Sequence, residues 1–203
     1  MHDIVTLILS TAVLVAIPGP NVALIVAKSV QQGFRAGFVA TLGTTTGIAV
    51  QLLLVVFGIS AIIFLAAAAL TFIKWAGVAY LIWLGIKTWK AAATAPDAPV
   101  ASPASVTFFQ GLIVALLNPK ILLFNAAFLP QFVHMDGPVF GQLLLMSGVY
   151  LSVLFLGDLL WALLGASAKP WLSRYGRFSQ RLSGSFFIAA GIGLALSRQR
   201  LVG

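Results

Sequence analysis

Two short proline motifs hold the residues that are best suited to chemistry in this chain. The first motif consists of Pro18, Gly19, Pro20 and Asn21, and the second consists of Asn118, Pro119 and Lys120. Each motif interrupts a long apolar run, and proline removes a backbone N–H, so carbonyl groups are freed inside both helices. In hydrocarbon such breaks persist only where they are buried in protein or line a wet cavity. We call residues 18–20 the first break and residues 118–120 the second break.

The first break offers groups that recognise charge. Pro18 leaves the carbonyl of Leu14 without its helical donor, and Pro20 does the same to Ala16. Gly19 lets the backbone bend and lets a ligand approach closely. The freed carbonyls suit an ammonium group, and the N–H groups that begin the next half-helix suit a carboxylate. The break is therefore interpreted as part of a substrate site, with a simple proline kink as the structural alternative.

The second break carries a cation in an apolar setting. A lysine near the bilayer centre is costly, so Lys120 is expected to face the protein interior. We expect it to bind a substrate carboxylate; a buried ion pair with Asp158, or an ammonium that reaches a water-filled crevice, are the alternatives. Asn21 and Asn118 offer amide groups to a substrate, and they serve equally well as caps for the freed backbone.

Asp158 is the acidic residue that lies well inside an apolar run. Helical spacing places it on one face with Ser147, Leu154 and Trp161, which indicates a face towards the bundle. Burial and a nearby lysine act on a carboxyl group in opposite directions, and a group so balanced can load and release a proton. The predicted role is proton coupling, with ammonium binding or a structural pairing as alternatives.

The second apolar run, 38–64, contains further polar residues. Gln51 lies near its middle and is a candidate substrate contact, whereas Thr44 and Thr46 are expected to bond mainly to their own helix. Gly43 and Gly47 have the spacing of small residues at close helix contacts.

Six apolar runs are long enough to cross a bilayer, which takes about 20 residues. They are 4–27, 38–64, 72–92, 106–130, 139–166 and 182–197. The Pro/Ala/Ser-rich segment 94–105 is interpreted as a solvated linker, so a single membrane domain, 1–203, divides into halves 1–93 and 106–203. A shift of 101 residues aligns Pro18 with Pro119, and three helices per half require the second half to be inverted. The predicted fold is an all-α integral membrane protein with six transmembrane helices in two inverted three-helix repeats, with helices 1 and 4 broken at the prolines.

Composition supports a membrane transporter. The chain is 61% hydrophobic and 8% charged, against roughly 25% charged residues in soluble domains. The chain has a net charge of +8. Its lysines and arginines are expected mainly in short loops between the apolar runs, which favours lipid headgroups over nucleic acid as their partners. Absence of cysteine excludes disulfides and thiolate chemistry. The sequence shows neither a nucleophile–base pair nor a metal-ligand cluster, so no enzyme activity and no cofactor are expected.

The distribution of lysine and arginine predicts the orientation. Loops after the first, third and fifth runs hold eight cations, against three on the opposite face, so these loops are expected in the cytoplasm and both termini in the periplasm. The eight are Lys28, Arg35, Lys87, Lys90, Lys169, Arg174, Arg177 and Arg181.

The residues resemble a known family. Over essentially its full length the chain looks like a lysine-exporter superfamily member of the RhtB (homoserine/threonine-exporter-like) type. The resemblance rests on the first break, the run 74–85, the second break with the run 128–132, and Asp158. It implies an inner-membrane protein with six helices that exports neutral or hydrophobic amino acids or their derivatives, driven by the proton gradient. Asn125 departs from the bulky apolar or aromatic residue usual there, and is therefore a candidate for substrate choice.

Two other functions in the same superfamily compete with amino-acid export. A divalent-metal exporter needs several carboxylates or histidines in one place, and a small-solute channel needs a ring of charges or a glycine-rich filter. Neither pattern is present. The expected partners are an amino-acid substrate, protons and the lipid bilayer, with no nucleic acid; a homodimer is left open.

Overall fold

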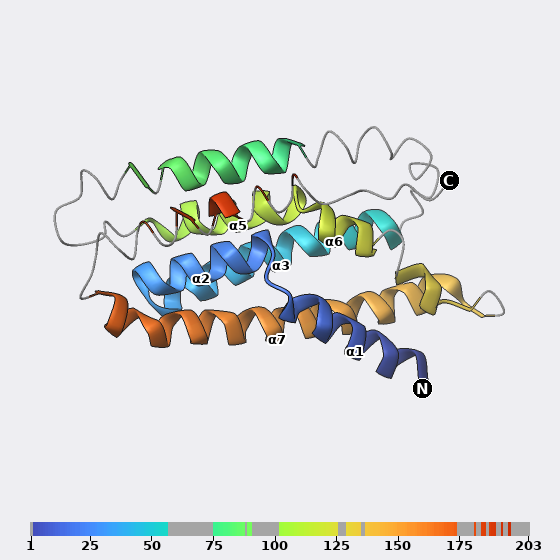
Figure 1. The fold of residues 1–203 in the computed structure, drawn as a ribbon. Helices are drawn as coiled ribbons and strands as arrows, with labels where there is room; N and C mark the ends of the chain where they lie inside the picture. The colour runs from blue at the N-terminus through green and yellow to red at the C-terminus, as the bar shows by residue number, and fades with distance from the viewer. Residues whose placement is uncertain are drawn as a thin grey trace.

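The computed structural model is all-helical across the residues that it describes (Figure 1). These residues are 2–56, 75–87, 89–90, 102–125, 129–134, 137–173, 181, 184–185, 187–189, 192 and 195. The helices are α1 (His2–Ala16), α2 (Pro20–Gln32), α3 (Phe34–Val56), an unlabelled helix (Trp75–Lys87), α5 (Ala104–Leu116), α6 (Pro119–Leu123), the 3-10 turn η3 (Leu129–Phe132) and α7 (Val139–Ser173). No strand occurs in these ranges, which confirms the all-α class.

Several helices have the length and composition of membrane spans. α3 and the segment Val139–Ala168 of α7 are long and apolar enough to cross a bilayer. α1 and α2 meet the same criteria only when taken together, and they are bent by 58° at the first break, as in a broken span or a re-entrant loop. The helix Trp75–Lys87 and α5 are apolar but shorter. Of the expected sixth span, 182–197, the structure describes only 184–185, 187–189, 192 and 195, so six spans in an inverted repeat stay a prediction.

Both predicted helix breaks are present. α1 ends at Ala16 and α2 begins at Pro20, while α5 ends at Leu116 and α6 begins at Pro119. Proline suits the first helical position because its missing N–H would have no helical partner there. Asn118 caps α6, since its side-chain oxygen accepts a hydrogen bond from the backbone N–H of Lys120 at 3.1 Å. Local sequence therefore accounts for where both helices stop and restart.

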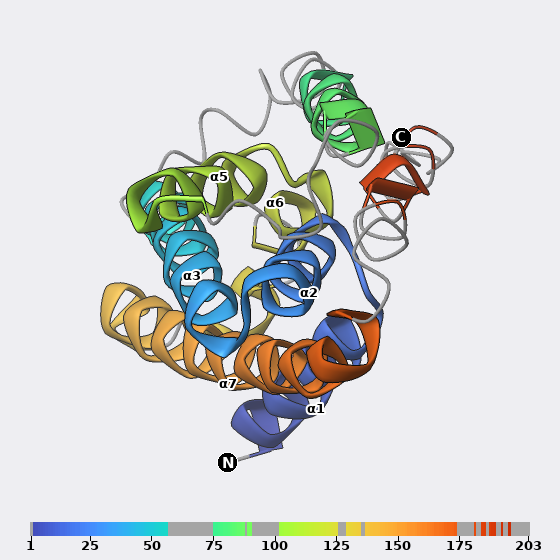
Figure 2. The ribbon, with the colours of Figure 1, turned by 90° about the vertical axis from the view of Figure 1, so that its left-hand side faces the viewer.

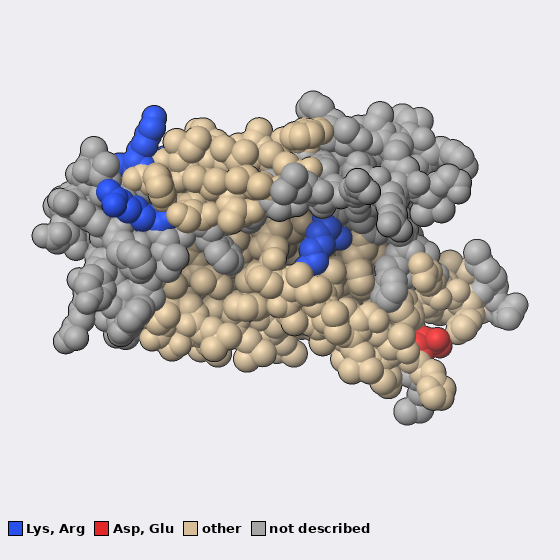
Figure 3. Space-filling model, in the orientation of Figure 1, with Lys and Arg blue, Asp and Glu red and all other residues tan. Residues whose placement is uncertain are grey.

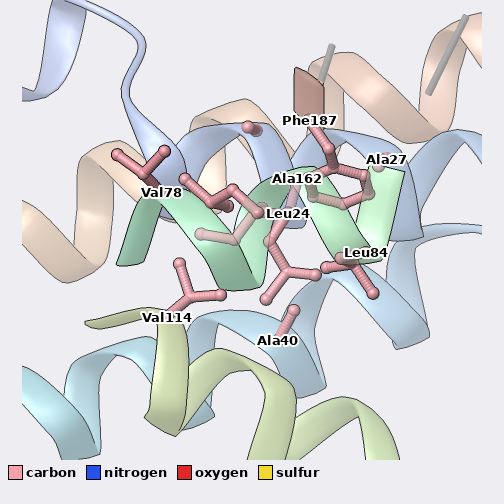
Figure 4. Close-up of a cluster of buried hydrophobic side chains, with 11 residues drawn as sticks. Leu24, Ala27, Ala40, Val78, Leu84, Val114, Ala162 and Phe187 are labelled. Atoms are coloured by element: carbon pink, nitrogen blue, oxygen red, sulfur yellow. The ribbon is translucent and has the colours of Figure 1, made fainter. Parts of the chain in front are cut away.

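α2 occupies the centre of the bundle. It packs against α3, α5 and α7, as the end-on view shows (Figure 2), and ten of its thirteen residues are buried. Its apolar side chains join a core cluster that includes Leu24, Ala40, Val114 and Ala162 from four helices (Figure 4). This central position carries the beginning of α2, next to the first break, into the interior.

α3 and α5 approach each other closely through glycines. A Cβ placed on Gly47 would lie 2.8 Å from the Cβ of Ala115, and one on Gly111 would lie 2.5 Å from the carbonyl oxygen of Ala40. Side chains at these positions would force the helices apart. The predicted close packing at Gly43 and Gly47 is confirmed, and it brings α3 against the second break.

Two details of the predicted boundaries are wrong. Lys28, predicted to lie in a loop, is inside α2 and only 8% exposed, because its ammonium donates to the hydroxyl of Ser102 at 3.2 Å. The turn to α3 is a single residue, Gly33, with φ 92°. Segment 94–105 is also not wholly a linker, since α5 begins at Ala104.

The surface is that of a protein in contact with lipid. Large side chains of α7 such as Leu156, Leu160 and Leu164 are at least 60% exposed, and burying such surface in hydrocarbon is favourable. In Figure 3 the lysine and arginine side chains gather at the left-hand end, apart from one small group midway along the tan face. The N-terminus lies at the opposite end (Figure 1).

Candidate functional site

The two breaks lie side by side. The side-chain amide of Asn118 donates to the side-chain oxygen of Asn21 at 2.9 Å. The ammonium of Lys120 donates to the main-chain carbonyls of Leu14 at 2.7 Å and Ile17 at 2.8 Å. These contacts confirm the prediction that the breaks meet.

Lys120 replaces the hydrogen bond that proline removes at the first break. The carbonyl of Leu14 is the one whose helical donor Pro18 lacks, and the lysine ammonium supplies a donor in its place. The stem of Lys120 lies beside Gly19, where a Cβ would be 3.6 Å from Cδ of the lysine, an ordinary van der Waals contact. A nearby carbonyl, that of Val15, accepts from the indole N–H of Trp161 at 3.0 Å.

Gln51 has the corresponding position at the second break. Its side-chain amide nitrogen donates to the carbonyls of Ala115 at 3.0 Å and Leu116 at 3.3 Å, and Pro119 is the residue that deprives Ala115 of its helical donor. The amide oxygen of Gln51 accepts from the side chain of Asn125 at 3.0 Å. At each break, main-chain carbonyls thus accept hydrogen bonds from a side chain in the other half of the sequence.

A small, partly open pocket lies between the breaks, with a cavity volume of about 20 Å³. Its walls come from α1, α2, α3, α6, α7 and the residues that join them. The lining residues are Leu14, Val15, Ile17, Gly19, Asn21, Val22, Ile48, Asn118, Lys120, Ile121, Leu154 and Asp158. The pocket therefore combines apolar walls with one cationic and one anionic side chain.

The two charged side chains share the pocket without pairing. Among the described residues an ion pair joins His134 and Asp3, whereas the nitrogen of Lys120 and the carboxylate of Asp158 do not come within 4.0 Å of each other. The alternative of a direct Lys120–Asp158 ion pair is thus not observed. Both side chains nevertheless line the same pocket.

Asp158 is 3% exposed and lies beside a hydroxyl of α3. The hydroxyl oxygen of Thr44 is 3.4 Å from the carboxylate of Asp158 and 3.0 Å from the carbonyl of Thr41. A hydroxyl has one proton, so Thr44 donates to one of these acceptors at a time. When Asp158 carries a proton, it donates to Thr44 and Thr44 donates to Thr41, so both contacts become hydrogen bonds. The geometry therefore accommodates a proton on Asp158.

The predicted inward face of α7 is confirmed. Ser147, Leu154 and Asp158 are each less than 8% exposed, and Trp161 reaches α1 as described above. Thr44 was expected to bond mainly to its own helix, and that expectation holds for only one of its two contacts.

The structure separates the predicted site residues into two groups. Those that line the pocket are Gly19, Asn21, Asn118, Lys120 and Asp158. Pro18, Pro20 and Pro119 shape the two breaks, while Gln51 and Asn125 are buried beside the second break and do not line this pocket.

Tyr150 was not foreseen. It is fully buried, its ring stacks on Phe124 with centroids 5.0 Å apart, and its hydroxyl has no hydrogen-bond partner in the described part of the chain. The hydroxyl of Ser147 and the side-chain oxygen of Asn125 are also buried without a hydrogen-bond partner in the described part of the chain. Such buried atoms are usually satisfied by water or a ligand. Within the described ranges, no three His, Cys, Asp or Glu side chains are grouped so as to hold a metal ion.

Comparison with known proteins identifies relatives of this chain. A family model described as LysE type translocator matches residues 12–198. The uncharacterized membrane protein YrhP of Bacillus subtilis is 28% identical, covering 97% of this chain and 100% of that protein. The homoserine/homoserine lactone efflux protein of Salmonella typhimurium is 29% identical, covering 94% and 95%. The leucine efflux protein of the same species is 28% identical, covering 74% and 76%.

No solved structure matches this chain. The family model, however, spans most of the sequence and includes both breaks, the pocket and Asp158. The full-length resemblance noted from the motifs is thereby confirmed, and it indicates a transporter rather than an enzyme. The chain belongs to the LysE type translocator family.

Proposed function

We propose that this protein is a secondary transporter that exports amino acids or close derivatives across the bacterial inner membrane, coupled to the proton gradient. The observation that carries the proposal is the pocket between the two breaks, where Lys120 and Asp158 face one space without pairing. Broken helices that meet at a polar site between two halves are typical of secondary transporters.

The lining of the pocket has the chemistry to bind a small zwitterion. Lys120 offers an ammonium to a carboxylate, while Asp158 and main-chain carbonyls offer oxygen atoms to an ammonium. Val22, Ile48 and Leu154 provide apolar walls for an uncharged side chain. Two relatives are named for efflux of leucine and of homoserine or its lactone. These compounds share an α-ammonium group, and the lactone lacks a free carboxylate, so we infer that the ammonium is the feature recognised in common.

Asp158 is proposed to carry the coupled proton. It is the acidic side chain in the pocket, and its contact with Thr44 accommodates the protonated form. Because substrate and proton meet in one space, binding of the substrate ammonium to a charged Asp158 and binding of a proton compete. Such competition at one carboxylate is sufficient to exchange substrate for protons.

The test is transport by purified protein in proteoliposomes with an imposed pH gradient. Leucine, homoserine and homoserine lactone are offered, and we expect gradient-driven accumulation of at least one. Asp158→Asn keeps the shape of the side chain but cannot titrate, so it should abolish accumulation while retaining exchange of labelled for unlabelled substrate at equal pH.

Asp3→Asn is the matched control. Asp3 lies at the exposed start of α1, where it pairs with His134, so accumulation should be unchanged. Normal accumulation by Asp158→Asn would show that the proton travels by another route. Loss of exchange along with accumulation would assign Asp158 to substrate binding or structure instead.

A further inference from the structure

The ammonium of Lys120 occupies a position built for an ammonium. Two main-chain carbonyls, of Leu14 and Ile17, converge on its nitrogen at 2.7 and 2.8 Å. Both residues line the pocket. Leu14 lies in the last turn of α1 and Ile17 directly follows that helix, at the first break. Carbonyl oxygens that lack a helical donor form a strong site for any N–H cation of suitable size.

Nothing in the chemistry of these carbonyls is specific for lysine. A primary ammonium at the end of a side chain and the α-ammonium of a free amino acid carry the same charge and the same three N–H donors. The same oxygen atoms can therefore receive a cation from the pocket once Lys120 moves away.

We propose that the carbonyls of Leu14 and Ile17 form the subsite for the substrate ammonium, and that Lys120 fills this subsite until a substrate displaces it. The proposal rests on the function proposed above and adds to it the atoms that bind the substrate. An arriving amino acid exchanges its own ammonium for that of Lys120. The released lysine is then free to contact the substrate carboxylate, while the substrate ammonium remains in the pocket that Asp158 also lines. The exchange leaves no carbonyl and no ammonium without a partner.

The experiment removes the internal ammonium and supplies an external one. Lys120→Met keeps an unbranched apolar stem, so purified protein should bind ethylammonium at the vacated carbonyls, measured by the shift of thermal unfolding with concentration. We expect an affinity about tenfold or more above that of the unmodified protein, because charged hydrogen bonds to two carbonyls are regained. Tetramethylammonium has the charge but no N–H, and it should produce no shift.

Lys28→Met is the matched control variant. Lys28 is also buried in a helix, but its ammonium contacts Ser102 and is remote from the pocket lining, so its removal should leave ethylammonium binding as weak as in the unmodified protein. In Lys120→Met, leucinamide should displace ethylammonium, since it has an ammonium and no free carboxylate. N-acetyl-leucine, which has a carboxylate and no ammonium, should not.

Lys120→Gln provides a second route if the methionine variant does not fold. Its amide can still donate to a carbonyl, but it carries no charge, so ethylammonium should again bind more tightly than to the unmodified protein. Variants that fold and bind ethylammonium no better would overturn the proposal. Failure of both variants to fold would also overturn it, because Lys120 would then be a permanent structural cap. Absence of amino-acid transport would contradict the proposed function but would leave these binding results in place.

Discussion

The hydroxyl of Thr44 has one proton and two acceptors within reach, Thr41 on its own helix and Asp158 on α7. A protonated carboxyl resolves this conflict by donating to the hydroxyl. Thr44 is therefore expected to hold the proton-loaded form of Asp158 in a defined geometry, as a positioning residue that acts through the carboxyl group.

Thr44→Val tests this role, since valine keeps the branched shape and lacks the hydroxyl. We expect pH-driven accumulation to fall about tenfold, consistent with loss of one hydrogen bond to a buried group, while exchange at equal pH is retained. Thr44→Ser should restore most of the activity. Thr46→Val is the control, because that exposed hydroxyl bonds the carbonyl of Leu42. An equal fall in both activities would argue for a structural role.

Single residues also show where sequence reasoning ends. The chemistry of proline predicts that the carbonyl of Leu14 lacks its helical donor, and the cost of a charge in hydrocarbon predicts that Lys120 needs a partner. That the ammonium of Lys120 donates to the carbonyl of Leu14 was not foreseen, because 106 residues separate the two in the sequence. Local rules identify an unsatisfied group, whereas the identity of its partner depends on tertiary packing.

At the scale of the helices, the two breaks are completed reciprocally. Lys120 of α6 caps carbonyls at the end of α1, and Gln51 of α3 caps carbonyls at the end of α5. Proline position is a local property, so both interruptions could be predicted from the sequence. The extent of α2 could not, because the burial of Lys28 depends on Ser102.

Gln51→Leu should destabilise the protein. The carbonyl of Leu116 and the side-chain amide of Asn125 would lose the partner that Gln51 provides, whereas the carbonyl of Ala115 would keep the backbone N–H of Asn118. Each buried group left unsatisfied costs roughly 1–3 kcal/mol. Thermal unfolding in detergent, monitored by circular dichroism, should show a clear fall in midpoint. Thr46→Val serves again as the control with little change. An unchanged midpoint for Gln51→Leu would mean that water satisfies these groups.

For the whole molecule, the charge distribution bears on orientation. Among the described residues, the lysine and arginine side chains visible in Figure 3 gather at the end remote from the N-terminus, apart from one group midway along the face (Figures 1 and 3). Cations are enriched on the cytoplasmic side of membrane proteins. We therefore propose that this end faces the cytoplasm and that the termini are periplasmic.

The absence of native cysteine allows a direct test of this orientation. In intact spheroplasts a membrane-impermeant maleimide should label His2→Cys, whereas Lys87→Cys should react only after the membrane is permeabilised. Both positions are exposed in the structure. The reverse pattern would contradict the proposed orientation.

The pairing of the halves was the part of the architecture that the sequence indicated least directly. The shift that aligns Pro18 with Pro119 suggests related halves, and the contacts across the breaks agree with it, but sequence periodicity does not specify which faces meet. Close approach of α3 to α5 through glycines such as Gly47 and Gly111 decides that geometry.

The separation of Lys120 from Leu14 in the sequence also has a consequence for synthesis of the chain. Ribosomes add about 5–20 residues per second, so about 5–20 seconds pass between the emergence of Leu14 and that of the lysine, 106 residues later, that completes its hydrogen bonding. During that interval the first helix pair is expected to remain beside the insertion machinery or water rather than enter lipid in its final form. A ribosome that stalls before Lys120 should leave a nascent chain whose first break is accessible to water and to proteases.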